Sequence, residues 1–200
     1  MKPLSPSLPH IIAMVGAPGS GKTQFAVEFA KIFNSPVVSS RQFEVFTDNT
    51  KTISDATLSL LEEFLKTKQT VILDGSTDQR TNRMRINRLA REYGYKVLFV
   101  WVQTDPTTAK HRWIKTYGGN DESFERRLKQ FSAPHSSESY IVISGRHTLS
   151  SQARTVLKQI GASRPEVPRR PIAGNRISIG KLGQLLPTKN SERLSLKNVA

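Results

Sequence analysis

The chain has 200 residues, of which 36% are hydrophobic, and this is enough apolar material for one buried core. It contains no cysteine, which excludes disulfides and thiolate-bound metals, and it has no apolar run of about 18 residues, so we expect no membrane span. The net charge of +14 favours contact with polyanions such as nucleotides, nucleic acid or anionic headgroups, although high charge also simply aids solubility.

Short apolar runs alternate with helical patterns across residues 10–160. The apolar runs predict strands over residues 11–16, 37–39, 71–73, 97–102 and 140–144. Apolar positions at helical spacing predict helices over residues 23–33, 53–65, 80–93, 107–117, 123–131 and 149–160. Ser54 or Asp55 is expected to cap the second of these helices, and Gly94 is expected to end the third.

Continuous apolar strands separated by helices indicate a five-stranded parallel sheet that is covered on both faces. The predicted fold class is therefore α/β, a three-layer α/β/α sandwich. Sheets of this kind bind ligands at the carboxyl ends of their strands. The unusual residues of this chain follow the first three strands, at 16–23, 39–41 and 74–77, so we expect the site there.

Two regions are expected: an ordered domain over residues 1–160 and a basic, flexible tail over residues 161–200. The tail is rich in proline, glycine, serine and basic residues, and its apolar residues are too sparse for a separate core. At the other end, residues 1–10 hold three prolines and one lysine, without the layout of a secretory signal. We therefore expect a cytoplasmic location.

A phosphate-binding loop is predicted directly after the first strand. The pattern G-x-x-x-x-G-K-[ST] is matched in full by Gly16, Ala17, Pro18, Gly19, Ser20, Gly21, Lys22 and Thr23. The glycines allow the backbone amides to point inward at phosphate oxygens, and the following helix adds the positive end of its dipole. Lys22 is expected to reach the outer phosphates of a triphosphate, Thr23 to bind Mg²⁺, and Gln24 to complete the binding segment. A chance match is unlikely to be flanked by a strand and an amphipathic helix, so we predict nucleotide binding.

An acidic residue should hold the magnesium water shell opposite Thr23. Asp74 ends the third predicted strand and is the candidate for this role. The alternative is a turn or capping aspartate before Gly75. We favour the metal role because of the phosphate-binding loop it would serve.

Several motifs together resemble the polynucleotide-kinase-like P-loop kinases, which are often catalogued as AAA-type ATP-binding proteins. The motifs are the loop at 16–23, the strand and loop at 71–77, Arg83, and the stretch at 88–97. The likeness extends over roughly residues 10–145. It implies a nucleoside-kinase-like fold, phosphoryl transfer from ATP to a hydroxyl acceptor, and a mobile lid that brings basic side chains onto the transferred phosphate. The resemblance places the lid after the fourth strand, where Arg112 and Lys115 are the first choices and Arg126 or Arg127 the second. An ordinary basic helix face is the alternative.

The sequence departs from this family after the second strand. The family carries an aspartate there, which accepts the proton of the acceptor hydroxyl, and an arginine three residues later. Here the two positions are occupied by Arg41 and Glu44, so the usual catalytic base is missing. Glu44 or Asp48 could replace it from the same loop. Because phosphoryl transfer has a loose transition state, a slow kinase, a kinase with another acceptor and a non-catalytic binder all remain open.

The predicted helix over 80–93 carries arginines that we expect on one side, away from the apolar face on the sheet. Arg80 and Arg83 stand nearest the site and, with Arg41, are the candidates for contact with the acceptor or with nucleic acid. A solvated helix face is the alternative.

The leading hypothesis is a small kinase that uses ATP and Mg²⁺ and phosphorylates a polynucleotide 5′ end or a small metabolite. One alternative is an ATP-dependent regulatory or nucleic-acid-binding module with little phosphotransfer, and another is an ATPase within a larger assembly. The sequence identifies neither the acceptor nor the oligomeric state.

Overall fold

The computed structural model describes residues 8–118 and 120–162, which belong to a compact unit, Met1–Pro165. The predicted tail at 161–200 lies outside the described residues except for Gly161 and Ala162, which end the last helix. The predicted boundary at residue 160 therefore stays a prediction. Within the described part of the chain, no helix combines the length and the apolar character needed to cross a membrane.

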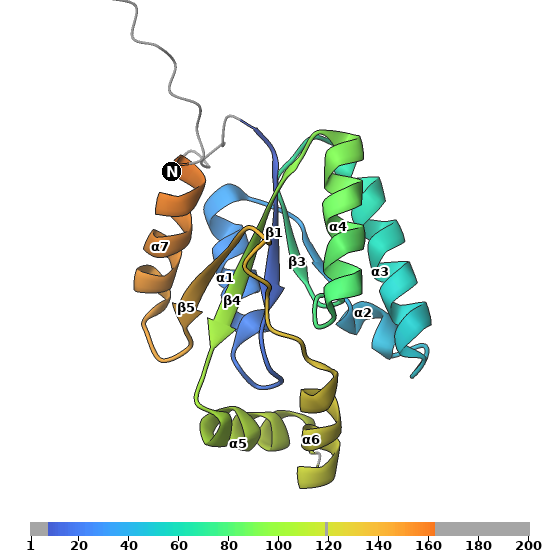
Figure 1. Ribbon diagram of the computed structural model, residues 1–200, viewed down its shortest axis with the longest axis vertical. Coiled ribbons are helices and arrows are strands. Elements are labelled where there is room, and N and C mark those ends of the chain that lie inside the picture. Colours follow the sequence, from blue (N-terminus) through green and yellow to red (C-terminus); the bar gives the residue numbers. More distant parts are fainter. Residues whose placement is uncertain (1–7, 119, 163–200) are drawn as a thin grey trace, which may run out of the picture. The chain divides into compact units, whose positions relative to one another are not determined.

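A sheet of five parallel strands forms the centre of the unit (Figure 1). The strands are β1 (His10–Val15), β2 (Val37–Ser39), β3 (Val71–Asp74), β4 (Lys96–Gln103) and β5 (Tyr140–Ser144). Their order across the sheet is β2-β3-β1-β4-β5, and every pair is parallel. The predicted three-layer α/β/α class with a five-stranded parallel sheet is confirmed.

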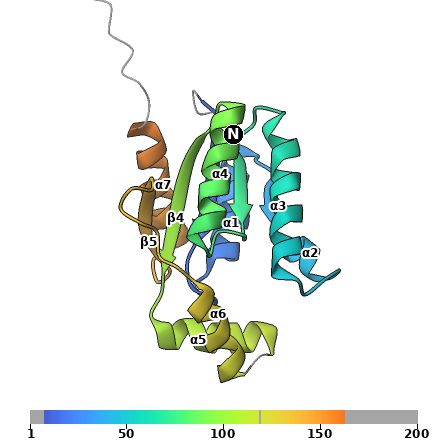
Figure 2. The same cartoon turned by 45° about the vertical axis from the view of Figure 1, so that its right-hand side comes forward.

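Helices cover both faces of this sheet and extend beyond one end of it. They are α1 (Lys22–Phe33), α2 (Arg41–Glu44), α3 (Thr50–Leu65), α4 (Arg80–Tyr93), α5 (Pro106–Tyr117), α6 (Asp121–Gln130) and α7 (Leu149–Ala162). One face is covered by α1 and α7 and the other by α3 and α4, each with its own apolar cluster. The pair α5 and α6 lies past the carboxyl ends of the strands, as Figures 1 and 2 both show.

Strand β1 is the centre of both apolar layers. All six of its residues are buried, and their side chains alternate between the two faces. Ile12 and Met14 pack with α1, whereas Ile11, Ala13 and Val15 pack with the layer beneath α3 and α4. A central strand buried on both faces needs a continuous apolar sequence, which is why this strand was predictable.

The ends of the helices show which local signals were interpreted correctly. Gly94 follows α4 in the left-handed conformation with φ 73°, so the predicted end of that helix is confirmed. The predicted caps of α3, Ser54 and Asp55, are wrong, because the helix begins at Thr50 and its cap is Asn49. The Asn49 side chain accepts hydrogen bonds from the amides of Lys51 and Thr52. The earlier start places Ser54 inside the helix, where it is buried.

Helix α4 presents its apolar face to the sheet as predicted, but Arg83 lies on that face as well. Its buried residues are Arg83, Ile86 and Ala90, three and seven residues apart along one stripe. The prediction that Arg83 lies on the solvent face is therefore wrong. A charged side chain occupies this core stripe because a carboxylate and several carbonyl oxygens surround it, as described below.

Candidate active site

The loop between β1 and α1 takes a backbone path that requires glycine. Gly16, Gly19 and Gly21 have φ of 151°, 73° and 100°. A Cβ on Gly19 would lie 2.0 Å from the carbonyl oxygen of Ala109 in α5, and one on Gly16 would lie 2.5 Å from that of Val102. The loop is thus pressed against β4 and α5, which fixes its shape from outside.

Helix α1 begins without any capping by the protein itself. Its N-cap, Gly21, offers no side chain, and the first turn holds no acidic residue. The first amides of a helix need an acceptor, and together with the helix dipole they favour an anion. The predicted binding segment, from Gly16 to Gln24, therefore surrounds a helix N-terminus suited to phosphate.

Lys22 folds back over this loop. Its Nζ donates to the carbonyl oxygens of Gly16 at 2.6 Å and of Ala17 at 2.9 Å. Burial lowers the pKa of Lys22, while the nearby charges of Asp78 and Asp74 act to raise it. Phosphate oxygens would also favour the charged form, so this cation suits a triphosphate.

The Ser20 hydroxyl of the loop lacks a hydrogen-bond partner in the part of the chain that the structure describes. The Ser20 side chain is 1% exposed, and its hydroxyl oxygen has no hydrogen bond within the described residues. Buried hydroxyl groups normally have a partner, so this one points to a ligand that completes the site. The glycine conformations, the uncapped helix and this hydroxyl together fit a bound nucleotide phosphate.

Thr23 and Asp74 line the same cavity from α1 and from the end of β3. Asp74 is 4% exposed, and the Ser39 hydroxyl donates to its Oδ2 at 3.4 Å. Among the described residues no three His, Cys, Asp or Glu side chains form a metal-binding group. The two residues therefore suit Mg²⁺, which keeps several waters and phosphate ligands, rather than a metal held in an all-protein cage.

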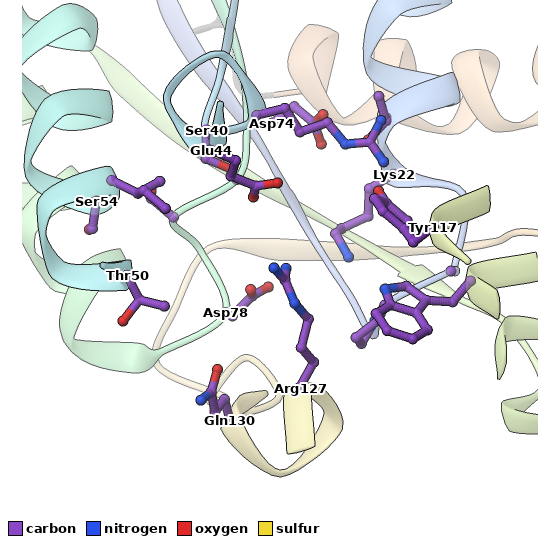
Figure 3. Close-up of a pocket in the computed structure, with 18 of the residues that line it drawn as sticks. Lys22, Ser40, Glu44, Thr50, Ser54, Asp74, Asp78, Tyr117, Arg127 and Gln130 are labelled. Atoms are coloured by element: carbon purple, nitrogen blue, oxygen red, sulfur yellow. The ribbon is translucent and has the colours of Figure 1, made fainter. Parts of the chain in front are cut away.

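A cavity of about 1070 Å³ extends from the P-loop across the ends of the strands (Figure 3). Charged side chains of both signs line it. The cations are Lys22, Arg41, Lys51, Arg85, Arg112, Arg126 and Arg127, and the carboxylates are Glu44, Asp48, Asp74 and Asp78. Its walls come from α1, α2, α3, α4, α5 and α6, so it has room for an acceptor beyond the phosphates.

Helices α5 and α6 occupy the position predicted for the lid. They pack on each other through a small apolar cluster that includes Trp113 and Phe124, whose rings lie 5.9 Å apart. Lys110 of α5 also pairs with Asp121 of α6 at 2.8 Å. Helices α5 and α6 therefore form one packed unit next to the P-loop.

The predicted lid cations divide into two groups. Arg112, Arg126 and Arg127 all line the cavity. Arg127 reaches from α6 into the cavity toward Lys22 and Asp78 (Figure 3). Lys115 is exposed and does not line the cavity, so in this arrangement α6 supplies cations that were only second choices.

The segment after β2 shows what has replaced the family's aspartate. Arg41 begins the short helix α2, and its guanidinium lies 4.6 Å from the ring centroid of Tyr117 at the end of α5. Glu44 and Asp48 line the cavity from α2 and the following loop. The structure thus brings both candidate replacement carboxylates to the cavity, with Arg41 stacked against the lid.

The two arginines predicted for acceptor contact on α4 behave differently. Arg80 is exposed and does not line the cavity. Arg83 is 0% exposed, and its guanidinium forms an ion pair with Glu138 at 2.8 Å. All its nitrogens donate to protein oxygens, so the prediction that Arg83 contacts an acceptor is wrong. Its role is to hold the structure together.

Sequence reasoning missed Asp78. This residue lies on the loop between β3 and α4, four positions after Asp74, and lines the cavity. Its position after a strand was a usable signal, because the carboxyl ends of parallel strands gather the functional residues. Lys51 and Arg85 were also missed, and in sequence nothing distinguishes them from surface cations.

The parallel sheet, the glycine-dependent loop and the paired helices over it define a nucleotide-binding P-loop domain with a kinase-type fold. Residues 11–137 match the family model described as "AAA domain". The chain therefore belongs to this family of P-loop kinase-like domains. A search of the curated proteins finds no match.

Several solved structures share the fold. A Kti12 from Chaetomium thermophilum in complex with ADP-AlF3 has a TM-score of 0.67 at 15% identity, covering 76% of this chain and 97% of that one. A gluconokinase from Sinorhizobium meliloti 1021 has a TM-score of 0.61 at 17% identity, covering 78% and 93%. A sugar kinase from Janibacter sp. HTCC2649 has a TM-score of 0.58 at 21% identity, covering 78% and 96%. At these identities the likeness establishes the fold alone.

Proposed function

We propose that the chain transfers the γ-phosphoryl group of ATP to a hydroxyl group of an acceptor. The observation that carries the proposal is a single cavity with the P-loop at one end, the basic side chains of α5 and α6 over it, and a polar wall beyond. A phosphate-binding loop alone needs only a nucleotide-sized site, whereas a second, polar compartment suits an acceptor. The names of two structural neighbours, a gluconokinase and a sugar kinase, support the same reaction class.

We assign each residue a role according to its position in the cavity. Lys22 and the P-loop amides would hold the β- and γ-phosphates, and Thr23 and Asp74 would hold Mg²⁺. The metal, when bound, neutralises charge that develops between the two phosphates. Arg112 and Arg127 would stabilise the transferred group from the lid side, since charge on its equatorial oxygens needs donors fixed in place. Lys115 would join them only after a movement of α5.

The acceptor is proposed to be a polynucleotide 5′ end or a small polar metabolite. Both would find donors in the wall formed by α2, α3 and α4. We further propose contact with nucleic acid on the strength of the net charge of +14, and a cytoplasmic location as the default.

Labelled ATP provides the test. The full chain is incubated with [γ-³²P]ATP, Mg²⁺ and either a 5′-hydroxyl oligonucleotide or gluconate, and label on the acceptor is measured. We expect label on one of them and its loss in Asp74→Ala, because the metal is then held poorly. ATP binding in calorimetry without label on any acceptor would overturn the proposal.

A second candidate function is an ATP-dependent regulatory or nucleic-acid-binding module with little phosphotransfer. The observation that favours it is Arg41, which stacks on Tyr117 where the family carries its catalytic aspartate. In such a module, ATP would change the affinity for an oligonucleotide without transfer of label. Fluorescence anisotropy of a labelled oligonucleotide, with and without ATP, separates this function from the kinase.

A further inference from the structure

The position that normally holds the catalytic base carries the opposite charge in this chain. Arg41 follows β2 and cannot accept a proton, because a guanidinium stays protonated in proteins. General base help is worth a factor of about 10²–10⁴ in rate. If the proposed kinase works at an ordinary rate, another carboxylate has to stand beside the acceptor hydroxyl.

Asp78 is a further carboxylate on the wall of the cavity. It lines the cavity from the β3–α4 loop, and its side chain is exposed to the cavity rather than buried in the core. In Figure 3 its carboxylate lies next to the end of the Arg127 side chain, with Lys22 on the other side of that guanidinium. Among the charges that act on Lys22 to raise its pKa, Asp78 contributes more than Asp74 does. A carboxylate close to Lys22 is close to the phosphate which that lysine would bind.

The backbone of Asp78 is held on both sides. Its carbonyl oxygen accepts a hydrogen bond from the amide of Ser132 at 2.8 Å and lies 3.4 Å from Arg83 Nη1. The same Nη1 also donates a hydrogen bond to the carbonyl oxygen of Thr77 at 2.9 Å. The Thr77 hydroxyl in turn donates to the carbonyl oxygen of Met14 in β1. These bonds fix the loop to the sheet and to the segment that returns from α6.

Glu44 and Asp48 are the rival carboxylates, and they are held less firmly. Both line the cavity, and within the described residues their side chains, like that of Asp78, have no hydrogen bond or ion pair, so the difference lies in the backbone. The loop between them carries Val45 at 77% and Phe46 at 82% exposure, so few packing contacts fix its path. A general base has to be held within hydrogen-bond reach of the proton it removes, which favours the fixed loop.

We propose that Asp78 is the general base of the transfer reaction, in place of the aspartate that the family carries at position 41. This inference rests on the proposed function. The acceptor oxygen forms its bond to the γ-phosphorus while the bond from that phosphorus to the β–γ bridging oxygen breaks. ADP leaves with the electron pair of the broken bond, and the proton of the acceptor hydroxyl passes to the Asp78 carboxylate.

Several charged groups face the cavity that Asp78 lines. They are Lys22 from α1, Arg41 and Glu44 from α2, Asp48 from the loop after α2, Lys51 from α3, Asp74 from β3, Arg85 from α4, Arg112 from α5, and Arg126 and Arg127 from α6. A carboxylate accepts a proton as general base only in its ionised form, so the transfer rate should fall on the acidic side.

The experiment compares Asp78→Asn with Glu44→Gln, and uses Glu92→Gln as the matched control. Glu92 is an exposed carboxylate at the far end of α4, paired with Arg88. Each variant is assayed for transfer from labelled ATP to the 5′-hydroxyl oligonucleotide and to gluconate across a pH series. ATP affinity is measured by calorimetry, and the Mg²⁺ concentration for half-maximal rate is determined. Because Asp78 is exposed, its substitution should leave the fold intact.

We expect Asp78→Asn to lower kcat about 10²–10⁴-fold, to abolish the acidic limb of the pH profile, and to leave ATP affinity unchanged. A full rate in Asp78→Asn, or loss of the acidic limb in Glu44→Gln instead, would overturn the assignment and leave the proposed kinase function standing. Recovery of the Asp78→Asn rate at high Mg²⁺ would also overturn it, because the residue would then serve the metal. ATP binding with no transfer by the unaltered chain would remove the kinase function and the base together.

Discussion

The P-loop end of the cavity and its proposed acceptor end are held by different kinds of contact. At the P-loop end, glycines lie against backbone atoms of β4 and α5, and the whole binding segment is contiguous in sequence. At the acceptor end, the walls depend on side chains that meet from distant segments, such as Arg83 and Glu138, which are 55 residues apart. The residues of one end therefore lie in one contiguous segment whose glycines meet distant backbone atoms, whereas the other end depends on side-chain pairs between distant segments.

The difference determines where change is tolerated. At the P-loop a substitution meets backbone atoms that cannot move, whereas at the acceptor end a paired set of changes can preserve the structure and alter the ligand. Arg41 stands at such a position, and its guanidinium lies against the Tyr117 ring. The following predictions test this contrast, from the largest expected effect to the smallest.

The largest effect is expected at the buried pair. Arg83→Ala would leave the carboxylate of Glu138, whose side chain is 7% exposed, without its guanidinium partner. Removal of one member of a buried pair costs about 3–5 kcal/mol in the free energy of unfolding. Urea unfolding measures the loss. The matched control is Arg88→Ala on the same helix, where an exposed pair with Glu92 is worth about 0–1 kcal/mol. Equal effects at the two sites would contradict the contrast.

The same pair predicts a dependence on pH. Burial acts to raise the pKa of Glu138, but hydrogen bonds from Arg83 and from the amide of His135 lower it below its usual 4.5. The unfolded chain then binds the proton more readily than the folded chain does. This contribution to stability is present above pH 4.5 and is lost as the pH falls through the lower folded pKa. In Arg83→Ala, urea midpoints between pH 6 and pH 3 should fall less steeply.

Lys22→Ala tests the P-loop end. Loss of one cation that acts on the transferred charge should lower the transfer rate about 10²–10³-fold and weaken ATP binding. Calorimetry and the labelled-ATP assay measure the two quantities. Lys31→Ala, at the other end of α1 and paired only with Glu28 on the surface, is the control and should match the unaltered chain. An unchanged ATP affinity in Lys22→Ala would contradict the P-loop assignment.

Asn49→Ala tests the start of the acceptor wall. Loss of an N-cap side chain costs about 1 kcal/mol in the free energy of unfolding. Ser54→Ala is the control, because the buried Ser54 hydroxyl has no partner within the described residues and its removal should be neutral or stabilising. Thermal unfolding of the two variants distinguishes them. If Ser54→Ala lowered the stability more than Asn49→Ala, the result would indicate that Ser54, and not Asn49, caps the helix.

The smallest effect is expected at the contact between α2 and α5. A double-mutant cycle with Arg41→Gln and Tyr117→Leu should give a coupling of about 0.5–1 kcal/mol, the usual range for an exposed cation–π pair. The cycle is measured by urea unfolding. A coupling near zero would show that Arg41 is free of the lid in solution.

Much of the fold could be predicted because its signals are local. The strand β5 and the helix α4 were placed at their observed bounds, since apolar runs and the stop at Gly94 act within a few residues. The P-loop segment was placed for the same reason. What failed depends on distant partners or on weak local signals: Asn49 was overlooked as a cap, and the four-residue helix α2 has too little periodicity to detect.

The acceptor side resisted prediction for a physical reason. The spacing of Arg83 from Ile86 and Ala90 places it on the buried stripe of α4. Its partners, Glu138 and the carbonyl oxygens of residues 132 and 133, come from a distant segment that the helix pattern does not show. An arginine on a helix is normally assigned to solvent, because burial of a charge is costly unless it is paired. The place of Asp78 on the same cavity wall as Lys22 likewise follows from three-dimensional packing, although its place after β3 was visible in the sequence.

The order of the strands has a consequence for how the chain is made. Strand β1 is synthesised first, yet its partners come much later, with Ile11 beside Val71 and His10 beside Lys96. Gly19 meets its neighbour Ala109 later still. Such distant pairings slow folding and leave apolar segments exposed in the meantime. On the ribosome, this strand therefore has to wait until residue 109 has been made before the loop that follows it can take its final form.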